Sequence, residues 1–494
     1  MPPTFEQIPT LAVWEPVHPD DWGPGEARHF LERAGFASTT DLVEEATDLA
    51  AEGCCERFFP ETPLVIPEWI EKKIAEYDSL SEKARETKDR EARRMVYRER
   101  NQLYREFIKD FEYEWLLRAS HPDAAFRAKW ELFLSDVWVV ENRTVRDPSW
   151  ISSYWITMAE KSDLPYPQFC KDFSREPAMV RYLDLHRSSK KKPNENFARE
   201  LLELFTLGEG NYSEADIKQA ARSFTGRRLP KGEYREVEKQ RDNGTKTFFQ
   251  KTGNWDGDDI IDIVFQQPAA RTYLPSEAIR FYLTQDPISE ERLRFLGDLW
   301  AEENFQLDAL RRRLFSSRGF YAQDFRGTRI KSPIQFYLGN LQRLGLQPAP
   351  LPQRTTRPLR DMGQELFDPP NVRGWIGGAA WINAGKLAAR RQTADALFDP
   401  LPMKRLNADD KQRVEREEAR PGSRPFYLKP QQLTQLTGKS TEDVIRYIQD
   451  QLLATKPDPE YLGKIRDFLG ENPKPERIRT VVLTVIQSPQ YQLS

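Results

Sequence analysis

A segment near the middle of the chain, residues 193–208 (PNENFARELLELFTLG), holds the densest set of side chains that can do chemistry. Glu200 and Glu203 are three residues apart, so a helix places both carboxylates on one face. Paired carboxylates can bind a divalent cation or share general acid and base work. The same segment also fits a capped amphipathic helix, with Asn194 at its start and Arg199 paired with Glu203. The second interpretation is favoured, and both stay open.

A short acidic loop, residues 253–259, carries three alternating oxygen ligands of the kind that calcium loops use: Asn254, Asp256 and Asp258. Its glycine comes too early for such a loop, and the twelfth residue is Phe265 instead of glutamate. We therefore expect Asp258 or Asp259 to cap the helix that follows.

A second loop, residues 368–383, contains two tryptophans, three glycines and two prolines, which excludes a regular helix. Its tryptophans, Trp375 and Trp381, can line a binding pocket or pack into a rigid structural corner. The sequence supports these two interpretations equally, and both tryptophans are kept as candidate binding residues.

Several well-known catalytic patterns are absent from the sequence. There is no CxxC pair, no HExxH, no GxSxG, no GxxxxGK[ST] and no GxGxxG after a strand. The four histidines are scattered: His18, His29, His121 and His186. These absences argue against zinc and serine hydrolases, P-loop NTPases and dinucleotide-binding enzymes, and we expect no cofactor.

The composition is that of a soluble globular chain of 494 residues, 38% of them hydrophobic and 31% charged. The net charge of −3 provides no overall field that favours nucleic acid. The longest strongly apolar run, residues 481–486, is too short to span a membrane, and the first residues lack the pattern of a secretory signal. Two adjacent cysteines and one distant cysteine favour a reducing compartment. We therefore expect a cytoplasmic protein.

Hydrophobic periodicity predicts a mainly α-helical array with one minor β-hairpin around residues 242–244, where Asn-Gly is a turn signal. Residues 68–120 are charged and lack proline and glycine, which predicts a long charged arm made of one helix or a helical hairpin. The expected divisions are 1–67, irregular with short helices; 68–120, the arm; 121–400, the core with the candidate site; 401–430, a linker; and 431–494, C-terminal helices packed on the core.

Nine stretches, in chain order, carry a family resemblance: RHFLERAGF (28–36), REPAMVRYLDL (175–185), PNENFARELLELFTLG (193–208), YSEADIKQAARSFTG (212–226), DNGTKTF (242–248), TGNWDGDDIIDIVFQQPAAR (252–271), KSPIQF (331–336), FDPPNVRGWIGGAAWIN (367–383) and SPQYQL (488–493). Together they resemble the large bacterial family named for domain of unknown function 1800. The resemblance implies an α-helical protein and no established reaction. Members are often encoded beside an exported sulfatase-like protein, which implies a candidate protein partner.

Two departures from the family pattern fall where relatives carry histidine. The family has a Trp-His-Asn-His-Phe segment where this chain reads LSDVW (134–138), so Ser135 and Val137 replace the two histidines. Arg241 stands where a histidine commonly precedes an Asp-x-Gly-x-Lys-Thr segment. Histidines so placed, with carboxylates near them, would suit a metal or acid–base site. We expect this chain to have lost any such metal site; Asp136 and Asp242 remain as acidic neighbours.

Two functions remain open. The first is a non-catalytic scaffold or partner-binding protein, in which a buried ion-pair network is formed by Arg199, Glu200, Glu203 and Arg241. The second is a hydrolase in which Glu200 or Glu203 is the general base, Arg199 or Arg241 stabilises an anion, and Asp242 lies near them. The resemblance implies that relatives with the histidines would use a metal in that reaction. The first function is favoured.

Overall fold

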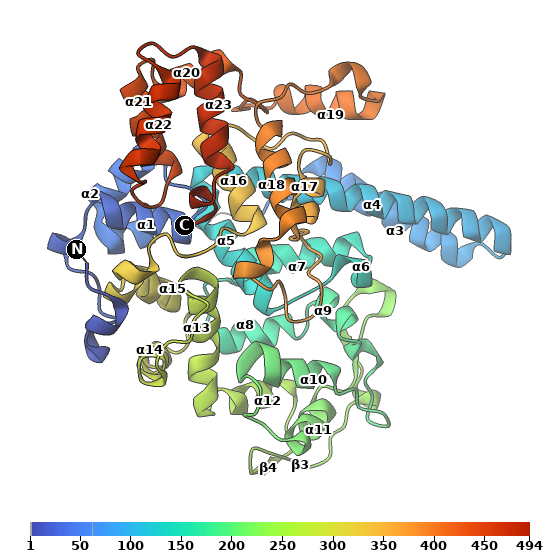
Figure 1. Ribbon diagram of the computed structural model, residues 1–494. Helices are drawn as coiled ribbons and strands as arrows, with labels where there is room; N and C mark the ends of the chain where they lie inside the picture. The colour runs from blue at the N-terminus through green and yellow to red at the C-terminus, as the bar shows by residue number, and fades with distance from the viewer. Residues whose placement is uncertain (1, 62) are drawn as a thin grey trace.

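The computed structural model describes residues 2–61 and 63–494 and is mainly α-helical, as the sequence predicts. Figure 1 shows helices crossing in several directions, with one helix pair projecting from a side and the C-terminal helices at the opposite end from strands β3 and β4. One continuous cluster of buried hydrophobic side chains runs from Phe5 to Tyr491, so both ends of the chain contribute to the same core.

The first part of the chain is almost entirely helical. Its helices are α1 (Pro24–Ala34), α2 (Thr40–Arg57), α3 (Glu68–Glu86), α4 (Arg90–Ser120), α5 (Pro122–Val137), α6 (Asn142–Val145), α7 (Pro148–Lys161), α8 (Tyr166–Phe173) and α9 (Pro177–Tyr182).

The middle of the chain adds the two small sheets. It contains α10 (Asn196–Glu200), the π-helical turn η5 (Leu201–Thr206), α11 (Glu214–Ser223), β1 (Arg227–Arg228), β2 (Arg235–Glu236), β3 (Lys246–Phe248), β4 (Lys251–Gly253), α12 (Gly257–Val264), α13 (Pro268–Tyr282), α14 (Glu290–Glu302), α15 (Leu307–Ser316) and α16 (Pro333–Arg343). The last part contains α17 (Thr356–Met362), α18 (Ala384–Ala396), α19 (Ala408–Glu418), α20 (Pro430–Thr437), α21 (Thr441–Tyr447), the π-helical turn η12 (Ile448–Leu452), α22 (Pro459–Leu469), α23 (Pro475–Ile486) and the short 3₁₀ helix η13 (Gln490–Gln492).

Local capping chemistry explains where several helices begin. Ser213 and Asp216 form a reciprocal capping box at the start of α11, since each side chain accepts the other's backbone N–H. At the start of α12 the expected cap is wrong: Asp256, not Asp258 or Asp259, is the N-cap. The side chain of Asp256 accepts the N–H groups of both later residues, which its extended backbone places within reach.

Residues 68–120 form a hairpin of two antiparallel helices, α3 and α4. The side chain of Asp89 caps α4 by accepting the N–H of Ala92. Near the base, the hydroxyls of Tyr77 and Tyr104 donate to backbone carbonyls of the α6 region at 2.6 and 2.7 Å. The base is therefore held by the core, and the distal end projects from the molecule (Figure 1).

Each of the two small sheets is a pair of antiparallel strands, β1 with β2 and β3 with β4. The two-residue turn of the second pair is Phe249-Gln250, and both residues have positive φ, 45° and 62°. A hairpin turn at Asn243-Gly244 was expected and is wrong. The side chain of Asp242 accepts the N–H of Gly244 at 2.9 Å, which makes this stretch a local loop and leaves it outside the strands.

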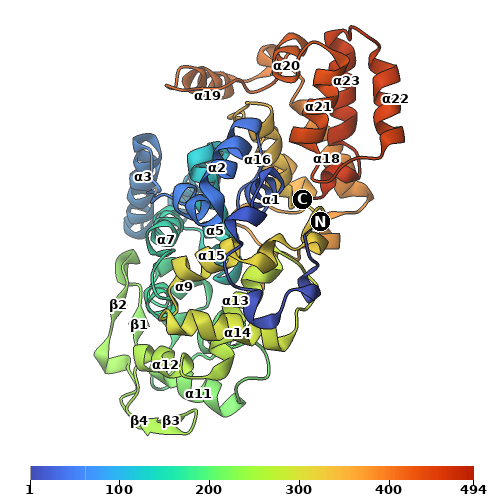
Figure 2. The same cartoon turned by 90° about the vertical axis from the view of Figure 1, so that its left-hand side faces the viewer.

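The segment 401–430, expected from sequence to be a linker, contains α19. Figure 2 shows α19 at the same end of the molecule as α20–α23. Val414 and Glu417 of this helix are buried, and the hydroxyl of Tyr113 in α4 donates to Glu417 at 3.2 Å. The division of the chain into five parts stays a prediction. None of the described helices is both long and apolar enough to cross a membrane.

Candidate functional site

The segment with the paired carboxylates is not one regular helix. α10 ends at Glu200, and in the π-helical turn η5 the N–H of Leu207 donates to the carbonyl of Leu202, five residues earlier, at 3.0 Å. The hydroxyl of Thr206 donates to the carbonyl of Leu201 and so supports the wide turn. Single π-helical turns are rare and are often found at functional sites.

Aromatic side chains from three neighbouring segments hold this π-helical turn in place. Trp138, just after α5, stacks on Phe205 with 4.2 Å between ring centroids. The hydroxyl of Tyr166 donates to the carbonyl of Phe205 at 2.6 Å, and that of Tyr273 donates to the carbonyl of Leu204. Backbone carbonyls that would accept hydrogen bonds within a regular helix thus accept them from tyrosine side chains. The shape of the turn is therefore stabilised by side chains of neighbouring segments.

Glu203 lies on the solvent side of η5 and is fully engaged within the chain. Arg373, from the Trp-rich loop, donates to Oε1 at 2.7 Å, and the hydroxyl of Tyr212 donates to Oε2 at 2.7 Å. Arg373 also binds Glu209 at 2.5 Å. This contact joins two segments that are 170 residues apart, and it leaves neither oxygen of Glu203 without a donor.

Arg199 does not pair with Glu203 as the helical spacing predicted. Its guanidinium makes two hydrogen bonds to the carboxylate of Glu214 in α11, at 2.8 and 3.0 Å, and a longer contact with Glu195 at 3.4 Å. Arg199 faces the neighbouring helix α11, where a two-pronged carboxylate pairing is available. The hydrogen bond from Arg199 lowers the pKa of the exposed Glu214.

Glu200 differs from its neighbours because it makes no hydrogen bond or ion pair with any described residue. It is half-buried, and burial raises its pKa, with a further increase from the negative charge of Glu203. The positive charges of Arg373 and Arg199 act in the opposite direction. A half-buried carboxylate whose pKa is raised holds its proton more readily than an exposed one, which suits a general acid or base.

Asp242 lies apart from these carboxylates, in the loop before β3. Arg222 of α11 donates to both of its oxygens at 2.7 and 3.1 Å, and the backbone N–H of Asp242 donates to the hydroxyl of Thr225 at 2.8 Å. The hydrogen bonds from Arg222 lower the pKa of Asp242. No described residue contacts both Asp242 and Glu203, so the structure does not bring these two candidates together.

Arg241 also belongs to the region of the small sheets. Its guanidinium lies 3.6 Å from Glu236, 3.5 Å from Glu238 and 3.9 Å from Asp256. The sequence predicts one buried ion-pair network of these residues, and this prediction is wrong because their side chains pair with three separate segments. Arg199 pairs with α11, Glu203 with the Trp-rich loop and Arg241 with the sheet region, because the side chains leave this part of the fold in different directions.

The three remaining candidate binding residues act as parts of the framework. The side chain of Asn194 accepts the N–H of Asn196 at 3.0 Å and donates to the carbonyl of Asp184 at 3.1 Å, which fixes the start of α10. Trp375 and Trp381 are both buried in the core. The glycine-rich part of their loop, at Gly378 and Ala379, lines a cavity of about 460 Å³ together with the residues that follow α13. The loop therefore packs into the core through its tryptophans and also forms part of the wall of a cavity.

Asp136, at the end of α5, connects this helix to the same loop. Its Oδ1 accepts the N–H of Trp375 at 2.9 Å. Burial raises the pKa of Asp136 to about 7; the hydrogen bond from Trp375 and the charge of Arg280 lower it, and Glu277 raises it. From the sequence alone, Asp136 is expected only as an acidic residue between Ser135 and Val137. The hydroxyl of Ser135 donates to the carbonyl of Leu132, and Val137 is part of the hydrophobic core.

Two partners of Glu203 were missed at the sequence level, Arg373 and Tyr212. A signal for Arg373 was present, since it is the one charged residue between Asp368 and Asn383 in an otherwise apolar and glycine-rich loop. A lone charge in such a loop needs a partner from elsewhere. Among the described residues, no three His, Cys, Asp or Glu side chains are grouped so that they could hold a metal ion.

Comparison with known proteins gives one match. The family described as "Protein of unknown function (DUF1800)" matches residues 29–493, nearly the whole chain. No curated protein and no solved structure matches.

Proposed function

Because the chain belongs to the DUF1800 family, whose description assigns no reaction, we propose a function from the site itself: a non-catalytic helical protein that binds a protein partner. One observation carries this proposal. Three of the four candidate catalytic side chains are already paired inside the chain: Arg199, Glu203 and Asp242. A substrate would have to displace these partners before it could use the groups.

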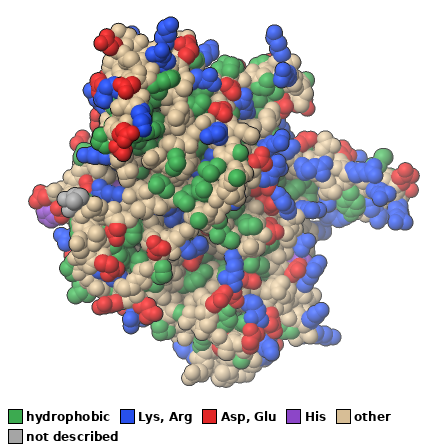
Figure 3. Space-filling view, in the orientation of Figure 1, with side chains coloured by type: hydrophobic (Ala, Val, Ile, Leu, Met, Phe, Trp, Pro, Cys, Tyr) green, Lys and Arg blue, Asp and Glu red, His purple; other side chains and the backbone are tan. Residues whose placement is uncertain are grey.

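The arm formed by α3 and α4 is the element that we assign to partner binding. In Figure 3 it extends from the body of the molecule with many basic side chains on its surface. Residues 82–98, at its distal end, include seven Lys or Arg and four Asp or Glu, a net charge of +3. Met95 and Tyr97 are 63% and 39% exposed there. Exposed apolar groups within a basic surface suit a partner with an acidic rim around an apolar patch.

The arm proposal is tested by site-specific crosslinking with the full-length protein in its source organism. A photocrosslinking amino acid replaces Met95, and we expect one predominant adduct with an acidic protein. Arg94→Glu with Arg98→Glu should abolish the adduct, since both side chains are exposed and unpaired among the described residues. The matched control, Arg294→Glu with Arg391→Glu, removes the same charge elsewhere and should leave the adduct. An adduct that survives reversal of the arm charge contradicts the proposal.

The non-catalytic part has a separate readout in metal content. The protein purified from its source organism should contain no stoichiometric iron or zinc. Tightly bound metal at one equivalent per chain would contradict this part even if the arm crosslinks as expected.

The same proposal includes a cytoplasmic location, which is supported by the three buried cysteines that form no disulfide, Cys54, Cys55 and Cys170.

A hydrolase remains the second candidate because of one observation, the unpaired and half-buried Glu200 with its raised pKa. In that function Glu200 is the general base and Arg373 is the nearest cation for a developing anion. Its test is turnover of activated esters and phosphate esters by the purified protein. Glu200→Gln should remove any turnover, whereas Glu214→Gln, a neighbouring exposed carboxylate, should not. Turnover that Glu200→Gln leaves unchanged rules out this assignment.

A further inference from the structure

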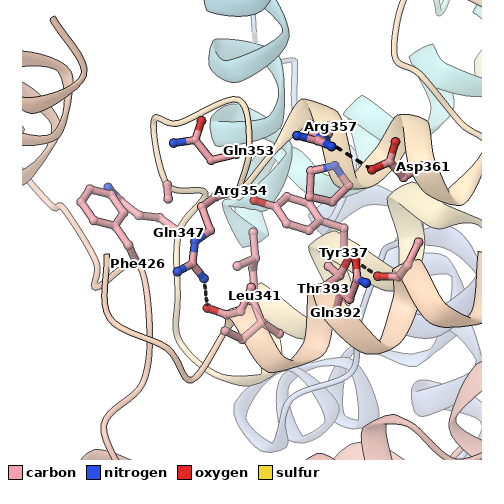
Figure 4. Close-up of a pocket in the computed structure, with 15 residues that line it drawn as sticks. Tyr337, Leu341, Gln347, Gln353, Arg354, Arg357, Asp361, Gln392, Thr393 and Phe426 are labelled. Carbon is pink, nitrogen blue, oxygen red and sulfur yellow. Dashed lines mark hydrogen bonds and ion pairs between the residues drawn. The ribbon is translucent and has the colours of Figure 1, made fainter. Parts of the chain in front are cut away.

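A cavity of about 230 Å³ lies among α16, α17, α18 and the irregular segment around Phe426 (Figure 4). Its apolar wall is formed by Leu341, Leu397 and Phe426. None of the candidate residues of the carboxylate segment and no residue of α3 or α4 lines this cavity. It is therefore a feature that the proposed function leaves unexplained.

The hydroxyl of Tyr337 is the polar group that this cavity leaves without a partner. The residue is 2% exposed, yet its hydroxyl makes no hydrogen bond with any described residue. In Figure 4 the hydroxyl points toward the side of the pocket where Gln353 and Arg354 lie. Other buried tyrosines in this fold, such as Tyr154 and Tyr166, donate to backbone carbonyls. This hydroxyl opens onto the cavity, so it can donate a hydrogen bond to an acceptor that enters from outside.

Arg354 supplies a fixed positive charge at the same wall. Its guanidinium donates to the carbonyl of Ala396 at 2.7 Å and to that of Pro400 at 3.2 Å, at the C-terminal end of α18. No described carboxylate lies within 4 Å of it, so its charge is oriented but not neutralised. Two of the five N–H groups of a guanidinium are occupied in this way, and the others stay free to bind an anion.

The charged side chains that line the cavity carry a net positive charge. Arg354 and Arg357 face one acidic residue, Asp361, which lies 3.6 Å from Arg357. Because burial raises the pKa of Tyr337, its hydroxyl stays protonated and acts as a donor at neutral pH. The cavity thus combines a neutral donor and a cation on one side with an apolar wall on the other.

We propose that this cavity binds a small carboxylic acid with an apolar body. The carboxylate accepts hydrogen bonds from the hydroxyl of Tyr337 and from Arg354, and the apolar body contacts Leu341, Leu397 and Phe426. The volume is below the roughly 300–1,000 Å³ of pockets for drug-sized ligands, so the ligand is a small acid. A planar carboxylate suits this donor set, and the apolar wall selects against fully polar anions such as phosphate.

The test is a titration of the purified full-length protein, followed by ligand-observed NMR and calorimetry, with four probes: phenylacetate, hexanoate, phenylacetamide and inorganic phosphate. We expect at least one of the two acids to bind with a Kd in the millimolar range or tighter. Phenylacetamide should bind at least about tenfold more weakly than phenylacetate, because it lacks the charge. Saturation by neither acid, equal binding of acid and amide, or tighter binding of phosphate would each overturn the proposal.

Tyr337→Phe removes only the unpaired hydroxyl and should weaken binding of the acid about tenfold, the effect of one hydrogen bond of about 1.4 kcal/mol. Since that hydroxyl has no partner in the chain, the variant should unfold at the same or a higher temperature. Arg360→Gln, in helix α17 beside the cavity but not in its lining, is the control and should bind normally. A Tyr337→Phe protein that binds the acid as tightly as the wild type contradicts the proposal.

Discussion

Asp136 stands between Ser135 and Val137, and its carboxylate accepts a hydrogen bond from the loop after α17. Because its folded pKa, about 7, lies above the ordinary 3.8, the folded protein holds this proton more tightly than the unfolded chain does. Its ionisation therefore opposes folding. Stability is lost as the pH rises from about 4 to about 7, and the loss is complete above pH 7.

This pH dependence should disappear in Asp136→Asn, whose amide oxygen can still accept the N–H of Trp375. Relative to the variant, the wild type should lose stability by on the order of 1 kcal/mol or more between pH 5 and pH 8. Urea unfolding at several pH values measures the difference. Parallel curves for the two proteins would show that Asp136 is ionised throughout or lies in a wetter environment.

Gly374 provides a second test at the level of one residue. Its φ is +77°, and an added Cβ would lie 2.2 Å from Oδ1 of Asp136. Gly374→Ala should therefore lower the free energy of unfolding by roughly 2–3 kcal/mol, from backbone strain and the clash together. Gly422→Ala is the control, since Gly422 has a similar φ of +74° but open space around it, and should cost about 1 kcal/mol. Equal losses in chemical denaturation would contradict the close approach.

Sequence could predict residue roles only where the partner is local. The capping box of Ser213 and Asp216, for example, joins residues only three apart in the sequence. Arg373 could not be assigned to Glu203, because the two are 170 residues apart and nothing local encodes their meeting. Arg199 and Glu203 have the spacing of a helical ion pair, yet they do not pair. Arg199 instead binds Glu214 on the next helix, which local spacing cannot predict.

At the scale of elements, the proline- and glycine-free stretch 68–120 predicts the arm well, since a long amphipathic run has few alternatives. The π-helical turn η5 could not be predicted in this way. Its letters, LLELFT, fit a regular helix, and the wide turn is held by Trp138, Tyr166 and Tyr273, which belong to other segments. Local pattern thus places the element, whereas tertiary contacts decide its geometry.

The contact between η5 and the Trp-rich loop gives an element-scale prediction. Arg373→Gln should leave the global unfolding free energy within about 1 kcal/mol, because the side chain is 57% exposed and such pairs contribute little. Amide hydrogen exchange in the loop around residues 370–377 should become faster, since Glu203 and Glu209 no longer hold it. The control is Arg360→Gln, 53% exposed, which should leave exchange in the loop unchanged. Unchanged exchange in Arg373→Gln would show that the tryptophans alone fix the loop.

At the scale of the whole molecule, three of the family-like stretches meet in one buried polar cluster. Glu32 of RHFLERAGF pairs with Arg343 of α16 and accepts the hydroxyl of Ser38 at 2.7 Å. Lys331 of KSPIQF donates to the carbonyl of Tyr491 in SPQYQL at 2.8 Å. Helix α1, the start of α16 and the last turn of the chain are therefore joined across more than four hundred residues. The stretches near both ends of the chain thus contribute contacts that stabilise the fold, apart from the carboxylate segment.

The pair of Glu32 and Arg343 can be tested by a double-mutant cycle. Burial alone would raise the pKa of Glu32, but Arg343 and Lys331 lower it to about 2. Each single variant, Glu32→Gln or Arg343→Met, should lower the unfolding free energy by about 3–5 kcal/mol, since the remaining charge is buried without its partner. The double variant should lose less than the sum of the two.

The same cycle has a definite pH dependence. Because the folded pKa of Glu32 lies below its ordinary value of 4.5, its contribution is complete above that pH and is lost as the pH falls toward 2. The wild type should therefore lose more stability than the double variant between pH 5 and pH 3 in urea unfolding. Additive losses, or an acid response that the double variant retains in full, would mean that Glu32 and Arg343 do not stabilise each other. The joining of the chain ends would then rest on the hydrogen bond from Lys331 to Tyr491 and on apolar packing.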